Sequence, residues 1–237
     1  MAKTHTDWKP LPHLDIEEVS DNLWRVQGTL EKMALKRVMT IARLANGSLV
    51  IHNGIALEEE SMRRIESWGT PAFIIVPNAY HRLDAPAYKA RYPKAQLLCP
   101  AGARKAVSQV VEVDRGCHEL PADEAVRWEG LDGVNDAEGV LLVKSQDGTT
   151  LVFNDILFNM PHAPGLTGLI FRYITQSTGG PRVSRIVRWF VIKDRAALRA
   201  SLERLAETPN LKRIIVSHHR VITDHPDRVL KEIAGTL

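Results

Sequence analysis

The chain has 237 residues and a formal net charge of +3, with 44% hydrophobic and 25% charged residues. This composition is typical of a soluble globular protein and excludes disordered and collagen-like classes. No apolar run approaches the ~20 residues that span a bilayer, and no apolar segment follows the first charged residues, so we expect a cytoplasmic protein without a membrane partner. The length favours a single domain over residues 1–237, with residues 1–20 as an N-terminal arm.

Cysteine and charge patterns indicate little chemistry. Cys99 and Cys117 fit neither a disulfide framework nor a zinc-ribbon spacing, so we expect two reduced thiols. The densest basic stretch, Arg182–Arg195, interleaves cationic residues with apolar and aromatic ones. Such a stretch can bind nucleic acid, but a solvated face is the favoured interpretation. A nucleic-acid partner is therefore disfavoured, and the sequence does not indicate an oligomeric state.

The first half of the chain begins with hairpins and continues with strand–helix units. Asn22–Gln27 alternates like a strand, and Asn46-Gly47 between two β-rich runs predicts a hairpin. Short apolar runs and amphipathic segments then alternate, as in buried strands with covering helices. We expect further strands at 38–43, 48–52, 73–76 and 96–99, and helices at 58–68, 84–92 and 101–110.

The second half repeats this order. We expect strands at 125–131, 139–145, 149–153 and 213–216, with a turn at Asp147-Gly148, and helices at 194–207 and 226–234. The segment Pro161–Pro181 is rich in glycine and proline and predicts a mobile loop or a broken helix. Two β-then-α halves fit an α/β protein in which two sheets pack face to face with helices outside.

Three of the predicted buried strands run directly into residues that bind metals or transfer protons. The strands end at Val76, Phe153 and Val216, and the residues are, in chain order, His81 and Asp84, Asp155, and His218 and His219. Loops at the carboxyl ends of strands are where α/β folds place ligands. Imidazole nitrogens and carboxylate oxygens suit zinc, iron or manganese. We therefore predict a metal site here.

Each of these residues also has a structural interpretation. Asp84 can serve only as the N-cap of the helix that it begins, and Asp155 can cap the turn that follows it. His81 by itself can be a hydrogen-bonded loop residue. The choice between His218 and His219 as the inward-facing histidine depends on one residue of register at a strand end.

With these residues in view, the chain resembles the metallo-β-lactamase superfamily, and most closely a branch of unknown function. The resemblance extends from about Asn22 to Ala234 and is carried by Asn22–Val26, Leu49–Gly54, a Pro-Asn-x-x-His signature in Ile75–His81, Val152–Asp155 and Val216–His218. It implies an αββα four-layer sandwich of two mixed β-sheets with outer helices. It also implies that Asp155 takes the place of the metal-bridging aspartate and His218 that of the late histidine.

The departures from the superfamily concern the metal ligands. Its His-x-His-x-Asp-His motif falls here on Ala79, His81, Leu83 and Asp84. A further histidine, expected before Gly139, is replaced by Asn135 or Asp136. The resemblance thus implies either no metal or one divalent transition metal (zinc, iron or manganese). The predicted metal ligands are His81, Asp84, Asp155 and His218.

Two functions fit these observations, and the sequence does not decide between them. The first is a metal-dependent hydrolase with a mononuclear, ligand-depleted site that acts on a small-molecule ester, lactone, thioester or phosphoester. In this hydrolase His81 and His219 are the predicted catalytic residues, as proton donors. The alternative is a non-catalytic binding or scaffolding protein of the same fold, which works through Pro161–Pro181 and the stretch around Trp189. An iron-dependent redox enzyme is least favoured, because the sequence shows no second cofactor domain.

Overall fold

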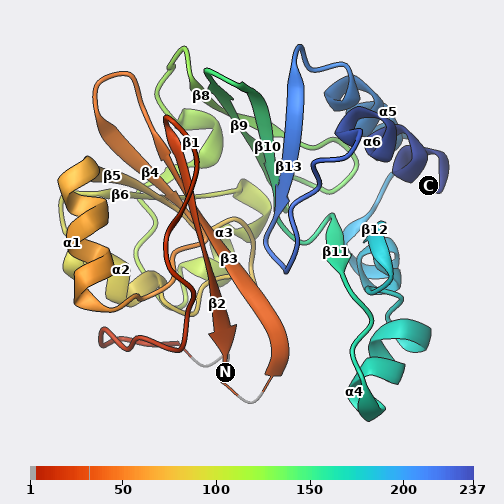
Figure 1. Ribbon diagram of the computed structural model, residues 1–237, viewed down its shortest axis with the longest axis horizontal. Helices are drawn as coiled ribbons and strands as arrows, with labels where there is room; N and C mark the ends of the chain where they lie inside the picture. The colour runs from red at the N-terminus through yellow and green to blue at the C-terminus, as the bar shows by residue number, and fades with distance from the viewer. Residues whose placement is uncertain (1–3, 32) are drawn as a thin grey trace.

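The computed structural model describes residues 4–31 and 33–237. Two mixed β-sheets pack face to face, and helices cover both outer faces (Figure 1). The first sheet contains, in spatial order, β1 (Glu17–Ser20), β2 (Leu23–Leu30), β3 (Met33–Arg43), β4 (Ser48–His52), β5 (Thr70–Ile75), β6 (Gln96–Cys99) and β7 (Arg115–Gly116). The second contains β13 (Leu211–Val216), β10 (Gly148–Phe153), β9 (Gly139–Ser145) and β8 (Val126–Gly130).

Three apolar layers hold the four structural layers together. In β4, Leu49 and Ile51 pack toward the helices, whereas Val50 packs into the layer between the sheets. In β10, Leu151 faces the helices and Val152 faces the first sheet. Both faces of these strands are buried, which is why they read as continuous apolar runs.

Five helices form the outer layers. The first sheet is covered by α1 (Glu59–Trp68), α2 (Ala85–Arg91) and α3 (Ala101–Val107), and the second by α5 (Arg195–Ala206) and α6 (Pro226–Gly235). The short 3₁₀ turn η1 (Cys117–Glu119) follows β7. The predicted αββα sandwich of two mixed sheets with outer helices is confirmed.

The segment between β10 and α5 is a broken helix flanked by short strands. Strand β11 (Phe158–Met160) pairs with β12 (Gly180–Arg182), and between them α4 (Gly165–Leu169) continues into a π-helical turn, η2 (Ile170–Ile174). A second π-helical turn, η3 (Val187–Val191), precedes α5. Figure 1 shows α4 projecting away from the two large sheets.

The N-terminal arm lies on the first sheet. The Trp8 indole donates to the Leu57 carbonyl at 2.9 Å, and the Thr29 amide donates to the Pro12 carbonyl at 3.0 Å. Within the stretch expected to be an arm, Glu17–Ser20 form the edge strand β1. In the described part of the chain, no helix is long and apolar enough to cross a membrane.

The topology brings the three predicted strand ends to one region. Strands β10 and β13 are parallel neighbours, with Phe153 paired with Val216, so their carboxyl ends lie together. The middle of β3 reaches the same place, because the Val38 amide donates to the Ser217 carbonyl at 2.9 Å. This bond joins the first sheet to the loop that carries the late histidines.

Candidate metal centre

His81, Asp155 and His218 form a cluster whose ligand atoms all lie within 4.8 Å of one another. The Nε2 atoms of His81 and His218 are each 3.0 Å from Asp155 Oδ1. The three residues follow β5, β10 and β13, respectively. The structure therefore brings together three of the four predicted ligands.

The outer ring nitrogens of both histidines are fixed by oxygen acceptors. His81 Nδ1 lies 3.0 Å from Asn53 Oδ1, and His218 Nδ1 lies 2.7 Å from the Lys36 carbonyl oxygen. The Asn53 amide nitrogen donates to the Val38 carbonyl, which fixes Asn53 Oδ1 as the atom that faces the ring. Neither oxygen can donate, so each Nδ1 carries the proton.

It follows that each neutral imidazole presents an unprotonated Nε2 to Asp155 Oδ1. Three acceptor atoms at such short separations repel one another unless a cation lies between them or both rings are protonated. A divalent metal resolves this conflict, and imidazole held through Nδ1 is the usual form of a histidine ligand. The donor chemistry of the cluster thus fits a metal ion.

Asn78 and Glu138 support the other oxygen of Asp155. The Asn78 amide nitrogen donates to Asp155 Oδ2 at 2.8 Å and also to Glu138 Oε1. When the rings of His81 and His218 carry protons toward Asp155, they hold its pKa well below the usual range, although burial raises it. Burial, with a smaller contribution from Asp155, raises the pKa of Glu138 to about 8.

Glu138 is a site residue that sequence reasoning missed, as are Asn53 and Asn78. Asn135 and Asp136, expected in place of a superfamily histidine, are held in a turn with positive φ, and Asp136 accepts from the Ala101 amide at 2.9 Å. Glu138 lies next to β9, is buried, and accepts from the Ile156 amide at 3.0 Å. An acidic residue directly before a buried strand was the available signal.

Asp84 lies outside the cluster. Its oxygens pair with His5 Nδ1 at 2.7 Å and with an Arg37 guanidinium nitrogen at 2.8 Å, and all three side chains are buried. Asp84 occupies the N-cap position of α2, but its side chain makes no capping hydrogen bond. The carboxylate instead forms a buried ion pair with Arg37, so Asp84 does not join the three other predicted ligands.

His219 is also directed away from the cluster. It has a positive φ of 66°, and its Nε2 accepts from the Lys36 amide at 3.4 Å. Burial lowers its pKa to about 4, with His218 adding to the effect. Such an imidazole is neutral at neutral pH and is a poor proton donor. His218, not His219, is therefore the inward-facing histidine.

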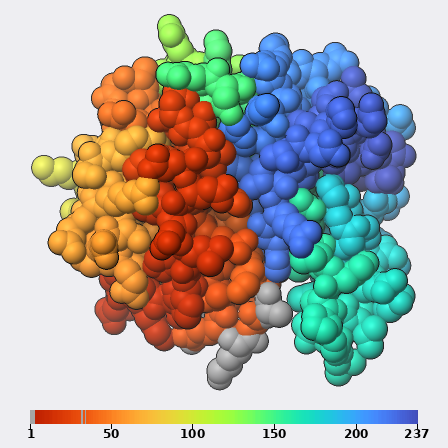
Figure 2. Space-filling model, in the orientation of Figure 1, coloured from red at the N-terminus to blue at the C-terminus, as the bar shows by residue number. Residues whose placement is uncertain are grey.

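A cavity of about 580 Å³ opens beside the cluster. The polar lining beside the cluster is formed by Arg37, Asn53, Asn78 and Glu138, the hydroxyl side chains of Thr175, Ser177 and Ser184 lie further along the wall, and most other lining side chains are apolar. Phe158 stacks on His218 with ring centroids 5.4 Å apart. In Figure 2 the surface is indented between the orange strands of the first sheet and the teal segment that contains α4.

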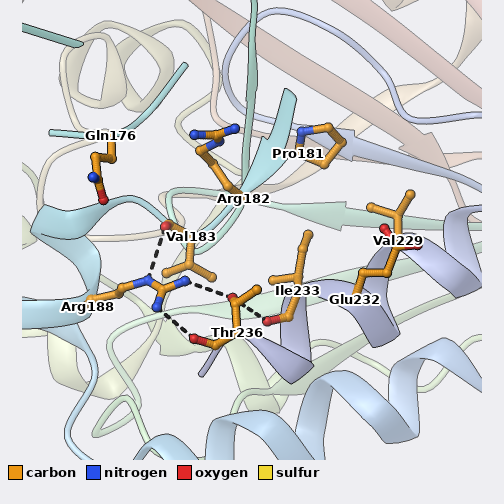
Figure 3. Close-up of a pocket in the computed structure, with 9 residues that line it drawn as sticks. All are labelled: Gln176, Pro181, Arg182, Val183, Arg188, Val229, Glu232, Ile233 and Thr236. Atoms are coloured by element: carbon orange, nitrogen blue, oxygen red, sulfur yellow. Dashed lines mark hydrogen bonds between the residues drawn. The ribbon is translucent and has the colours of Figure 1, made fainter. Parts of the chain in front are cut away.

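A second cavity, of about 370 Å³, lies between β12, η3 and α6 (Figure 3). Arg188 donates to the carbonyl and hydroxyl oxygens of Thr236 at 2.7 and 2.8 Å, and to the Val183 carbonyl at 3.4 Å. Its guanidinium thus attaches η3 to the end of α6. The residues that line this cavity contain no group of metal-binding side chains.

Comparisons with known proteins support the fold. No protein-family model and no curated protein matches the sequence. Solved structures do match: DIM-1 metallo-β-lactamase has 13% identity and a TM-score of 0.62, covering 96% of this chain and 99% of that one. FIM-1 from Pseudomonas aeruginosa, in its mono-zinc form, has 11% identity and a TM-score of 0.61, covering 96% and 97%. A metallo-β-lactamase from Pontibacter korlensis has 10% identity and a TM-score of 0.59, covering 94% and 100%. This chain has the metallo-β-lactamase fold.

Proposed function

We propose that this chain of metallo-β-lactamase fold is a metal-dependent hydrolase that holds one divalent ion at His81, Asp155 and His218. The observation that supports it is the convergence of the Nε2 atoms of two histidines, each with an oxygen acceptor at its Nδ1, on one oxygen of Asp155. Two imidazoles and one carboxylate form a donor set that suits zinc, with iron or manganese as alternatives.

The surroundings favour one ion over two. Among residues 4–31 and 33–237, His81, Asp155 and His218 are the only group of three or more side chains with metal-ligand spacing. Asp84, which a second ion would need, is paired with the Arg37 guanidinium and hydrogen-bonded to His5. The mono-zinc form of FIM-1 is a fold relative with the same stoichiometry as the one proposed here.

A bound divalent ion supplies Lewis acidity to a substrate oxygen and lowers the pKa of water. Other groups of this chain hold the three ligands in position. Asn53 and the Lys36 carbonyl orient the two histidines, and Asn78, held by Glu138, orients Asp155. Such supporting contacts are worth about 10- to 100-fold in metal affinity or activity.

The cavity restricts the substrate. Leu35, Met160 and Phe171 are among the apolar residues of its wall, and the acidic residues Glu138 and Asp155 lie at the cluster. An ester, thioester or lactone with an apolar acyl group matches this lining. A phosphoester is the second substrate class, because a bound divalent ion and Arg37 in the cavity lining would both attract its charge.

The test is the metal content of chelator-free protein, measured by inductively coupled plasma mass spectrometry. We expect one equivalent in the wild type after reconstitution with zinc, none in Asp155→Ala, and retention in Asp224→Ala, which removes an almost fully exposed aspartate. Circular dichroism establishes that each variant is folded. A folded wild type that binds no zinc, manganese or iron would contradict the proposal.

If no metal binds, the alternative function is a binding or scaffolding protein. The observation that favours it is the loss of superfamily ligands at Ala79 and Leu83. Hydrolysis of p-nitrophenyl esters of increasing acyl length separates the two functions. The hydrolase predicts turnover that Asp155→Ala abolishes, and the scaffold predicts none.

A further inference from the structure

The segment that contains α4, η2 and η3, residues 165–193, exposes many large apolar side chains, and we call it the apolar–basic surface. Seven of these side chains are between 49% and 76% exposed: Leu166, Leu169, Tyr173, Ile174, Ile186, Trp189 and Phe190. The two halves of the surface are joined, since the Arg185 amide donates to the Thr175 carbonyl at 2.8 Å. Contiguous exposed apolar groups of this kind mark interaction sites.

The same segment is uniformly basic. From Ile156 to Lys193 the chain contains no aspartate or glutamate, although it contains Arg172, Arg182, Arg185, Arg188 and Lys193. The Arg172 and Arg185 guanidinium groups lie 5.2 and 5.6 Å from the ring centroids of Tyr173 and Trp189. Cations and aromatic rings are therefore presented together.

We infer that the apolar–basic surface docks on an anionic lipid bilayer. Aromatic and aliphatic side chains of a peripheral protein enter the boundary between headgroups and acyl chains, while arginine and lysine contact anionic headgroups. This chemistry accounts for both properties of the surface. The sequence expectation of no membrane partner was based on the length of apolar runs, which concerns spanning and not docking.

Other occupants match the surface less well. Nucleic acid would pair with the cations and stack on Trp189, but it offers no partner for aliphatic side chains such as Leu166 and Ile174. A second copy in a two-fold dimer would place the same patch on both subunits and bring like charges together. A bilayer accepts the aliphatic groups and the positive charge together.

Docking would also place the cavity at the bilayer. Phe171, Ile186 and Phe190 belong to the surface and line the 580 Å³ cavity beside the cluster. An amphiphile with an acyl chain could then pass from the lipid to the cluster. The docking inference itself does not depend on the proposed hydrolase function.

The test uses the full chain with vesicles of phosphatidylcholine alone or mixed with phosphatidylglycerol. We expect sedimentation with the anionic vesicles only, and weaker binding at high salt because surface charges are screened. Trp189 is the only largely exposed tryptophan in the described part of the chain, so its emission should shift to the blue on binding, and Trp189→Phe should lose that shift.

Two sets of variants separate the contributions. Trp189→Ser with Phe190→Ser should abolish sedimentation, whereas Leu14→Ser, at an exposed apolar residue in the N-terminal arm, should not. Arg172→Gln and Lys193→Gln should each weaken binding about fivefold, since a cation at an anionic surface contributes about 1 kcal/mol. Arg63→Gln on α1 is the matched control.

Several results would overturn the inference. These are no sedimentation with either vesicle, a dimer in solution that Trp189→Ser disrupts, or binding to single-stranded RNA in preference to vesicles. Metal content measured on the same samples keeps the proposals apart. Vesicle binding by a protein that takes up no metal supports docking and contradicts the hydrolase. Metal binding without vesicle binding contradicts docking alone.

Discussion

His52 should make the folded protein sensitive to acid. It ends β4, is fully buried between the sheets near Trp128, and neither ring nitrogen has a hydrogen-bond partner. Burial, with a smaller contribution from His81, lowers its pKa from 6.5 to about 3. Because the folded pKa is below the unfolded one, this histidine has no effect on the pH dependence of stability above pH 6.5, and it lowers the stability of the fold as the pH falls from 6.5 toward 3.

The magnitude follows from the protons that the unfolded state binds. Each pH unit below 6.5 costs about 1.4 kcal/mol, so at pH 5 the wild type loses about 2 kcal/mol through this one residue. His52→Leu removes the titrating ring and replaces two unpaired nitrogens with apolar atoms. We therefore expect no loss of stability at pH 7.5 and a gain of about 2 kcal/mol over the wild type at pH 5.

Urea unfolding followed by circular dichroism measures both free energies of unfolding. A chelator is present throughout, because metal binding itself depends on pH. His52→Phe, which fills more volume, guards against a cavity effect of leucine. Equal differences between variant and wild type at pH 7.5 and pH 5 would refute the reasoning, since they would mean that His52 is not buried as a neutral ring.

Three further predictions concern stability. Asp84→Asn leaves the buried Arg37 charge uncompensated and should lower the free energy of unfolding in urea by about 3–5 kcal/mol. The folded variant should keep its metal content by mass spectrometry, and loss of metal would mean that Asp84 is a ligand after all. Tyr88→Phe removes the hydroxyl that donates to the Ile55 carbonyl at 2.8 Å and should cost about 1–3 kcal/mol, and an unchanged urea midpoint would contradict this. Gly133→Ala should lower the free energy of unfolding by about 2 kcal/mol or more, because φ is +79° and the new methyl group would clash with the Asp194 carbonyl oxygen. A thermal midpoint equal to that of the wild type would argue against this prediction.

The sequence allowed prediction of the fold because its signals are local. Buried strands such as Phe73–Val76 are continuous apolar runs, and the turns at Asn46-Gly47 and Asp147-Gly148 separate strands by composition alone. The π-helical turns have no such pattern, since their apolar residues do not repeat at helical spacing toward a core. For Pro161–Pro181, which contains the first of these turns, the sequence therefore predicts a loop or a broken helix without deciding between them.

The sequence predicted only those site residues whose positions follow from the ends of strands. His81, Asp155 and His218 follow strands whose carboxyl ends meet, so their proximity follows from topology. Asp84 also follows a strand, but its partners come from β3 and from the N-terminal arm. The spacing of residues along the sequence does not predict such pairings between distant segments, and for this reason the partners of Asp84 could not be predicted.

The parallel pairing of β13 with β10 has a consequence for the order of folding. Every strand of the first sheet is synthesised before β13, which must then close a long loop to reach its neighbour. Closing such a loop is slow relative to forming hairpins. His81 and Asp155 therefore exist on a growing chain well before His218 can join them. A chain synthesised only as far as β12 presents an incomplete set of donors, so the proposed ion would bind only after β13 and His218 have joined the fold.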